Sequence, residues 1–172
     1  MAPAFTPNHP RPQYGGQGGP TPNPLQGYLQ HGFLDENGNP RPELLTTTAQ
    51  IVARALSEGY PSVAYSQMRR FWSKIRFIEL QLDTAEARQP RDAQGQPVDP
   101  KAAFNEVKWR IAELCPDAAD AVNRGVASQQ FRTVIEKNVE FAQRDAANFR
   151  RGMMRHLRAV ICYYPRQDRG RN

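Results

Sequence analysis

The sequence has few of the residues that build disulfide scaffolds, zinc sites or membrane spans. Its 172 residues include only two cysteines and three histidines. Cys115 and Cys162 lack CxxC or Cys/His spacing, so we expect two buried, reduced thiols. The first residues lack the charged and apolar regions of a signal peptide. No apolar run approaches the roughly 20 residues that a membrane span needs. These features predict a cytoplasmic protein without membrane contact.

The sequence also offers few groups with which an enzyme could work. It contains no HExxH, no GxSxG and no glycine loop followed by the lysine of a phosphate-binding motif. His9 and His31 lie in a segment rich in proline and glycine. His156 lies between apolar and basic residues, which favours a structural role over that of a catalytic base. We therefore expect no catalytic residue, no metal site and no cofactor.

Proline and glycine are concentrated at the start of the chain. Residues 1–43 hold nine of the 15 prolines and seven of the 12 glycines. Apolar residues are too sparse there to build a packed core, so we predict a disordered or extended N-terminal extension with a few anchors such as Tyr28 and Phe33. Residues 44–165 form the predicted helical bundle domain, and residues 166–172 form a basic C-terminal tail.

The remainder of the chain lacks the alternation that is typical of strands and has helical periodicity instead. We predict helices over about 46–58, 66–88, 100–114, 116–125, 129–144 and 145–164, with a loop at 89–100. No internal repeat is evident. Trp72 and Trp109 fall on or beside apolar faces, which favours core packing over base stacking. The predicted fold is all-α, a compact bundle of five to six helices.

One predicted helix separates apolar from basic residues. Over residues 66–82 the apolar positions follow the spacing of a core-facing surface, at Met68, Phe71, Trp72, Ile75, Ile78 and Leu82. The basic residues fall mostly outside that stripe, at Arg69, Arg70, Lys74 and Arg76. Such a helix can bury one side in a bundle and present cations to an anionic partner on the other.

The basic residues of the whole chain favour nucleic acid as that partner. The net charge is +6, and arginine supplies 19 of the 23 basic residues. Arginine binds phosphate bidentately and stacks on bases. The last predicted helix repeats the spacing of the earlier one with Arg151, Arg155 and Arg158, so two cationic stripes could form one band along a phosphate backbone. The alternatives are solvated helix faces paired with acids, a protein–protein adaptor, or a helical DNA-binding regulator.

Several of these segments resemble a known family. Residues 45–51 (LTTTAQI) and 65–71 (YSQMRRF) are similar to a helix start found in the small all-helical subunits of type III-A CRISPR (Csm-type) RNA-guided effector complexes. Residues 114–124 (LCPDAADAVNR) resemble the short helix of that family. Residues 131–141 and 149–164 resemble its two closing helices. The N-terminal extension and the loop at 89–100 depart from the family pattern.

The resemblance implies a non-catalytic subunit of an antiviral ribonucleoprotein. Its implied partners are guide RNA, target RNA, the repeated backbone subunits, the large polymerase-like subunit and further copies of itself. It would hold the RNA by its phosphates without reading the sequence. The family motifs point to Arg69, Arg70, Arg76 and Arg124 as RNA contacts. The charge pattern alone adds Lys74, Arg151, Arg155 and Arg158.

Overall fold

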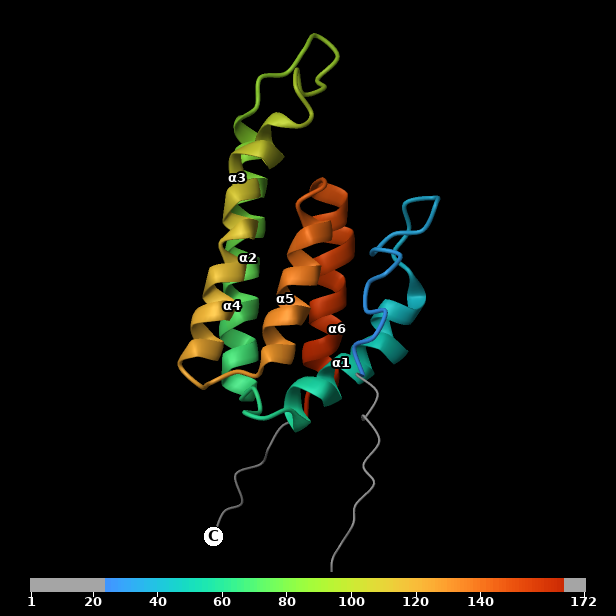
Figure 1. Cartoon of the computed structure of the whole chain (residues 1–172). Coiled ribbons are helices and arrows are strands. Elements are labelled where there is room, and N and C mark those ends of the chain that lie inside the picture. The colour runs from blue at the N-terminus through green and yellow to red at the C-terminus, as the bar shows by residue number, and fades with distance from the viewer. Residues whose placement is uncertain (1–23, 166–172) are drawn as a thin grey trace, which may run out of the picture.

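The computed structural model describes residues 24–165, and within that range every named element is helical (Figure 1). This confirms the all-α prediction. The predicted tail at 166–172 lies outside the described residues. The elements are η1 (Pro42–Leu45), α1 (Thr47–Glu58), α2 (Tyr65–Arg88), α3 (Ala102–Ala112), α4 (Leu114–Asn123), α5 (Gln129–Ala142), η2 (Asn148–Met154) and α6 (Arg155–Tyr163).

The longest helix, α2, is held against α3 and α4 along one side. Its buried residues follow the predicted stripe at Met68, Phe71, Ile75, Ile78 and Leu82, with Ala85 added. Two ion pairs join it to these two helices. Lys74 Nζ lies 2.5 Å from Asp117 Oδ2 in α4, and Arg88 Nη2 lies 3.0 Å from Glu106 Oε1 in α3. The apolar stripe therefore fixes which side of α2 is buried. Lys74 and Arg88, which lie beside the stripe, link α2 to α4 and α3 through these ion pairs.

The helices α5 and η2–α6 form the other half of the bundle. Ser128 caps α5 by accepting a hydrogen bond from the Phe131 amide, and the ring of Phe131 meets Phe71 of α2 edge to face at 4.9 Å. Asp145 caps the next helical segment by accepting a hydrogen bond from the Asn148 amide at 2.7 Å. The single helix predicted for 145–164 instead begins with a seven-residue π-helical segment, η2, before α6.

Of the predicted extension at 1–43, residues 1–23 lie outside the described residues, and residues 24–43 fold against the bundle where their composition predicted a disordered or extended segment. Leu25, Leu29 and Phe33 are buried at 7 %, 4 % and 1 % exposure. These three residues are four apart in the sequence, and successive backbone turns bring their side chains to the same side of the segment despite the glycines between them. Phe33 rests on η2 where Gly152 has no side chain, because a Cβ there would lie 2.6 Å from the Phe33 ring. A few well-spaced anchors were enough to fold this part.

Buried hydrogen bonds fasten the same segment to the bundle. Leu44 O can only accept, so the Nδ1 atom of His156, 2.6 Å away, carries the proton. His156 Nε2 then accepts from the Tyr28 hydroxyl at 2.8 Å, and the Tyr28 oxygen accepts from Asn138 Nδ2 at 2.6 Å. His156 is 1 % exposed. This histidine therefore has a structural role, as predicted. We call its two hydrogen bonds, with Tyr28 and with Leu44 O, the His156 clamp.

Two loops have the same hairpin structure, and the sequence analysis did not predict this repeat. Asp35-Glu36-Asn37-Gly38-Asn39-Pro40 and Asp92-Ala93-Gln94-Gly95-Gln96-Pro97 share an aspartate, a glycine and a proline at the same spacing. In each, the aspartate side chain accepts from the amides two and four residues later, and the glycine has a positive φ of 72° or 77°. Antiparallel bridges join Leu34 to Pro40 and Arg91 to Pro97. Both hairpins lie toward the upper end of the molecule in Figure 1.

Four predicted core positions are wholly or partly accessible. Trp109 is 51 % exposed and its ring lies under the Arg110 guanidinium at 4.3 Å, so its predicted core packing is wrong. Cys162 is exposed and Cys115 is half-buried, so the two thiols are not both core residues. Trp72 packs against the core while remaining partly accessible. Helix spacing counted from the buried residues puts Trp109 and Cys162 on the side opposite the apolar stripe of their helices. Cys115 and Trp72 lie at the margin of theirs, where neighbouring helices decide burial.

Candidate nucleic-acid interface

The predicted basic residues of α2 are all exposed, but they do not share one side of the helix. Arg70 and Lys74 border a hollow between α2 and the α3–α4 side. Residues 69, 76 and 83 are spaced by seven and so lie on another side of α2. Asp83 on that side binds Arg150 of η2. Arg69 and Arg76 therefore lie beside η2–α6, and the single stripe expected from the sequence is divided in two.

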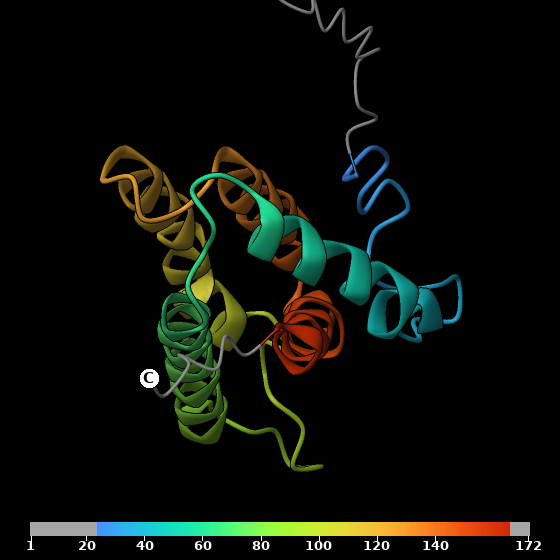
Figure 2. The ribbon, with the colours of Figure 1, turned by 90° about the horizontal axis from the view of Figure 1, so that it is seen from below.

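The helix α2 and the segment η2–α6 that lies beside Arg69 and Arg76 run antiparallel. Arg150 of η2 pairs near the C-terminal end of α2, with Asp83 and, at 2.7 Å, Glu86. At the other end Tyr164 donates a hydrogen bond to Val63 O, just before α2 begins. Figure 2 shows α2 and α6 next to each other when the bundle is viewed along its length. Arg155 and Arg158 lie on the exposed side of α6, between the levels of these two contacts, and helical spacing puts them on the same side as Arg151.

We call the exposed surface with Arg69, Arg76, Arg155 and Arg158 the α2–α6 face. Of these, Arg76 is paired with Glu79 on its own helix. Among residues 24–165, no carboxylate lies within 4 Å of the guanidinium groups of Arg69, Arg155 or Arg158. These three exposed guanidinium groups can donate hydrogen bonds to phosphate oxygens without first breaking an ion pair with a described residue.

The other predicted contacts lie elsewhere or are already engaged. Lys74 is held by Asp117, and Arg124 pairs with Asp120 at 2.8 Å in the turn after α4. Arg151 donates to Asn39 Oδ1 at 3.2 Å, which places it beside the first hairpin. Arg70 is exposed, with no carboxylate within 4 Å in the described part of the chain, but it lies on the α3–α4 side. The eight predicted residues thus form one adjoining set and several separate positions.

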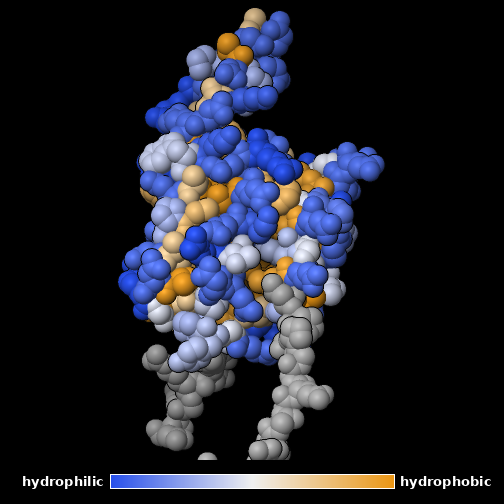
Figure 3. Space-filling view, viewed as in Figure 1, coloured by the Kyte–Doolittle hydropathy of each residue, from blue (hydrophilic) through white to orange (hydrophobic). Residues whose placement is uncertain are grey.

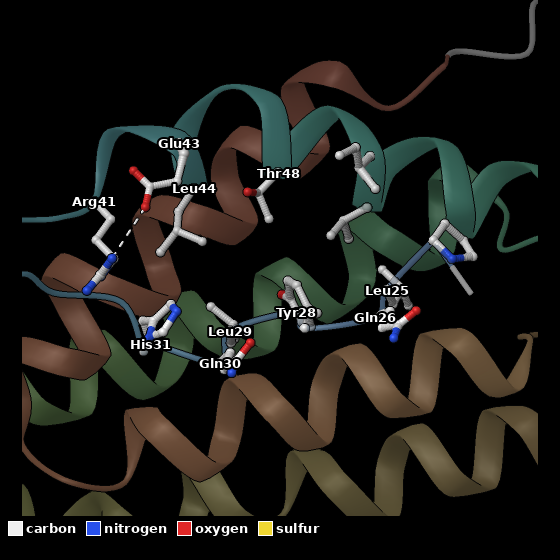
Figure 4. Close-up of a pocket in the computed structure, with 15 residues that line it drawn as sticks. Leu25, Gln26, Tyr28, Leu29, Gln30, His31, Arg41, Glu43, Leu44 and Thr48 are labelled. Atoms are coloured by element: carbon white, nitrogen blue, oxygen red, sulfur yellow. Dashed lines mark ion pairs between the residues drawn. The ribbon is translucent and has the colours of Figure 1, made fainter. Parts of the chain in front are cut away.

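The titratable groups of the described residues form no arrangement typical of a catalytic or metal site. Within residues 24–165 no group of three or more His, Cys, Asp or Glu side chains could hold a metal ion. Burial lowers the pKa of His156 to about 4, so this imidazole stays neutral and serves as a structural link. A hollow of about 220 Å³ beside residues 24–32 has His31, Arg41 and Glu43 on its wall, and Arg41 pairs with Glu43 at 3.5 Å (Figure 4).

Sequence reasoning missed one group of exposed residues. Phe77, Leu80 and Trp109 are 56 %, 59 % and 51 % exposed, between α2 and α3. Helical spacing already puts Phe77 and Leu80 outside the buried stripe of α2, and that signal could have identified them. Elsewhere hydrophilic residues predominate, as on the face seen in Figure 3, where hydrophobic residues are confined to small areas. None of the described helices is long and apolar enough to cross a membrane.

Comparison with known proteins gives one match. A protein-family model described as Csm2 Type III-A matches residues 39–168. This range covers most of the chain and includes α1 to α6, while residues 24–38 of the N-terminal segment lie before it. Searches of curated proteins and of solved structures gave no match.

Proposed function

Because the chain belongs to the Csm2 family and is thus a small subunit of type III-A CRISPR effectors, we propose that it binds the backbone of guide and target RNA through the α2–α6 face. In this proposal it performs no catalysis and supports an antiviral ribonucleoprotein in the cytoplasm. The observation that carries the proposal is that the guanidinium groups of Arg69, Arg155 and Arg158 have no carboxylate within 4 Å among residues 24–165.

The chemistry of this face suits contacts with phosphate and not with particular bases. Arginine forks match phosphate geometry, and exposed cations release condensed counterions when they bind a nucleic acid. In RNA-guided complexes base pairing supplies sequence specificity, so a protein subunit needs only to hold the backbone. Arg70, Lys74, Arg124 and Arg151 would make secondary contacts where neighbouring subunits bring RNA to them.

The proposed assembly has protein partners as well as RNA. The repeated backbone subunits and the large polymerase-like subunit are the expected neighbours, together with further copies of this chain. The family assignment supports membership of such an assembly. The alternatives are a basic protein–protein adaptor and a helical DNA-binding regulator, both of which could use the same arginines.

A matched pair of triple variants tests the RNA contact. Arg69→Gln/Arg155→Gln/Arg158→Gln removes the unpaired cations, and Arg54→Gln/Arg88→Gln/Arg132→Gln removes the same charge from ion pairs elsewhere. The first variant should weaken binding of unrelated single-stranded RNAs uniformly. It should also flatten the log–log salt dependence, by about 0.7 for each phosphate that the protein no longer neutralises.

The control variant should bind RNA nearly as the parent does. Equal loss in both variants would mean that net charge alone drives binding and would contradict the proposed face. Equal affinity for duplex DNA would favour the regulator. Unchanged RNA binding in the first variant, with helicity preserved, would favour the adaptor.

A further inference from the structure

A hollow of about 780 Å³ lies between α1 and the end of α6. Its large apolar side chains are Ile51 of α1 and Tyr163 of α6, which are 42 % and 43 % exposed. Ala55 and Glu58 of α1 also line it. We call it the α1–α6 hollow. Exposed aromatic and aliphatic side chains gathered in a hollow are typical of a surface that another segment covers.

The described part of the chain both begins and ends at this hollow. Pro24 and Pro165, the first and last described residues, are among those that line it. Residues 1–23 and 166–172 are therefore both tethered beside the hollow. A short tether gives a segment an effective concentration on the order of millimolar, so a contact that would be weak between separate molecules is enough to hold it.

Only one of these two segments has side chains that suit the hollow. Residues 166–172 (RQDRGRN) contain no apolar side chain. Residues 1–23 contain Phe5, Tyr14 and six prolines, with Arg11 as the one basic residue and no acid. Three of the prolines fall in residues 7–12 (PNHPRP), a composition that favours the polyproline II helix. Such segments lose little entropy on binding and are recognised in grooves lined by aromatic residues.

The spacing of residues in this segment matches the spacing along α1. A polyproline II helix has three residues per turn and rises about 3.1 Å per residue, so Arg11 and Tyr14 would share one edge, roughly 9 Å apart. Helical spacing puts Ile51, Ala55 and Glu58 on one side of α1, and seven residues of an α-helix span about 10 Å. Tyr14 can therefore contact Ile51 while Arg11 meets Glu58.

The carboxylate at this end of the hollow is available for a new partner. Glu58 pairs with Arg54 at 3.5 Å, between side chains that are 70 % and 78 % exposed. A solvated pair of this kind contributes little, so Glu58 can exchange Arg54 for Arg11 at small cost. Arg54 then points into solvent, where it is already largely exposed.

We propose that residues 7–14 of this chain dock in the α1–α6 hollow as a polyproline II segment. Tyr14 lies against Ile51 and Tyr163, and Arg11 binds Glu58. Residues 15–23 include four glycines and connect the docked segment to Pro24. A glycine-rich chain of nine residues spans roughly 15–18 Å, which suits a return to a hollow that Pro24 itself lines. The docked segment shields the apolar residues of the hollow from other molecules and leaves the α2–α6 face open.

A spin label on the N-terminal segment of the full chain tests this contact. Thr6→Cys carries the label beside the docked residues, and Cys115→Ser/Cys162→Ser removes the native thiols. In NMR spectra the label should broaden the amide signals of Ile51 and Ala55 and leave that of Trp109 sharp. The same labelled chain with Arg11→Glu/Tyr14→Ser keeps the tether and should lose most of the broadening. Equal broadening in both chains would reflect the tether alone and would overturn the proposal.

Variants of the hollow provide a second readout in the same labelled chain. Ile51→Ser/Tyr163→Ser should abolish the broadening, whereas Phe77→Ser/Leu80→Ser, which changes equally exposed residues outside the hollow, should not. Circular dichroism would check the fold of each variant. Unchanged broadening after Ile51→Ser/Tyr163→Ser would overturn the proposal.

Charge exchange and mixed samples complete the test. Arg11→Glu and Glu58→Arg should each reduce the docked population severalfold, and the double variant should restore it. Failure of that rescue would contradict the contact between Arg11 and Glu58. Isotope-labelled chains without the spin label should stay sharp when mixed with spin-labelled, unenriched chains. Broadening in that mixture would assign the hollow to the segment of a second copy and overturn the intramolecular contact.

Discussion

At the scale of single residues, His156 shows how one buried polar side chain holds distant segments together. Its two ring nitrogens bond Tyr28 and Leu44 O, which lie more than 100 residues earlier in the chain. The bond from Tyr28 requires the neutral ring, because only an unprotonated Nε2 can accept it, while Nδ1 donates to Leu44 O in either state. The sequence put this histidine between apolar and basic residues and thereby predicted a structural role. The sequence did not predict the two hydrogen-bond partners, because neither Tyr28 nor Leu44 is near His156 in the chain.

The clamp makes stability depend on pH. Burial lowers the pKa of His156 from 6.5 to about 4, so between these values the unfolded chain binds more protons than the native one. Stability should be complete above pH 6.5 and should fall by an amount on the order of 2–3 kcal/mol as pH drops toward 4. Urea unfolding at several pH values measures this. A His156→Gln variant should be less stable at pH 7 but nearly flat between pH 7 and 5, and a parent equally flat there would contradict the clamp.

Gly152 has no side chain, and the space that a side chain would occupy is filled by the ring of Phe33. A Cβ at this position would come within 2.6 Å of the Phe33 side chain. Gly152→Ala should therefore destabilise the protein by roughly 1–3 kcal/mol, the usual cost of overpacking a core. Thermal unfolding measures the loss. In a double-mutant cycle, Phe33→Ala should remove most of the penalty of Gly152→Ala, and strictly additive effects would show that the two residues do not compete for space.

At the scale of elements, the two hairpins show one local sequence used twice with unequal tertiary support. Their aspartates make equivalent bonds, at 2.9 and 2.7 Å for Asp35 and at 3.0 and 2.8 Å for Asp92. The first hairpin directly follows the buried Phe33, and Arg151 binds its Asn39. Residues 91–96 of the second hairpin are all exposed.

The same substitution should therefore have different consequences in the two hairpins. Asp35→Ala should cost roughly 1 kcal/mol, because loosening this hairpin disturbs the anchored segment. Asp92→Ala should stay within about 0.5 kcal/mol, as expected of a surface loop. Chemical denaturation compares the two, and amide exchange at Asn39 and Gln96 reports the local loosening. Equal costs would mean that the first hairpin is no better supported than the second.

The helix α2 is the element that the sequence described best. Its bounds, buried stripe and exposed cations follow directly from spacing, since helical geometry alone fixes which residues share a side. Spacing also puts Arg69 and Arg76 on a different side of the helix from Arg70 and Lys74. Which neighbour each side meets depends on where α3, α4 and η2 pack around the helix, and only the assembled bundle shows it.

At the scale of the whole molecule, residues 24–38 are part of the bundle although they precede the region matched by the family. Deletion of residues 1–38 should lower the melting temperature and increase binding of a hydrophobic dye, because it uncovers Gly152 and Phe141 and removes a partner of His156. Deletion of residues 1–23 is the matched control, since it keeps every contact among residues 24–165. Equal stability of both truncated chains would show that the segment adds nothing to the fold.

The sequence by itself determined the all-α fold, the limits of most helices and the presence of unpaired cations. These are local properties, set by the period of the apolar residues and by an excess of arginine over acidic partners. Only the tertiary structure decided that Arg150 binds Asp83 and Glu86 and that Lys74 binds Asp117. It also decided which arginines have no carboxylate partner among residues 24–165, and that Phe33 folds onto Gly152. Those outcomes depend on which distant surfaces meet, and spacing along one helix does not specify its neighbours.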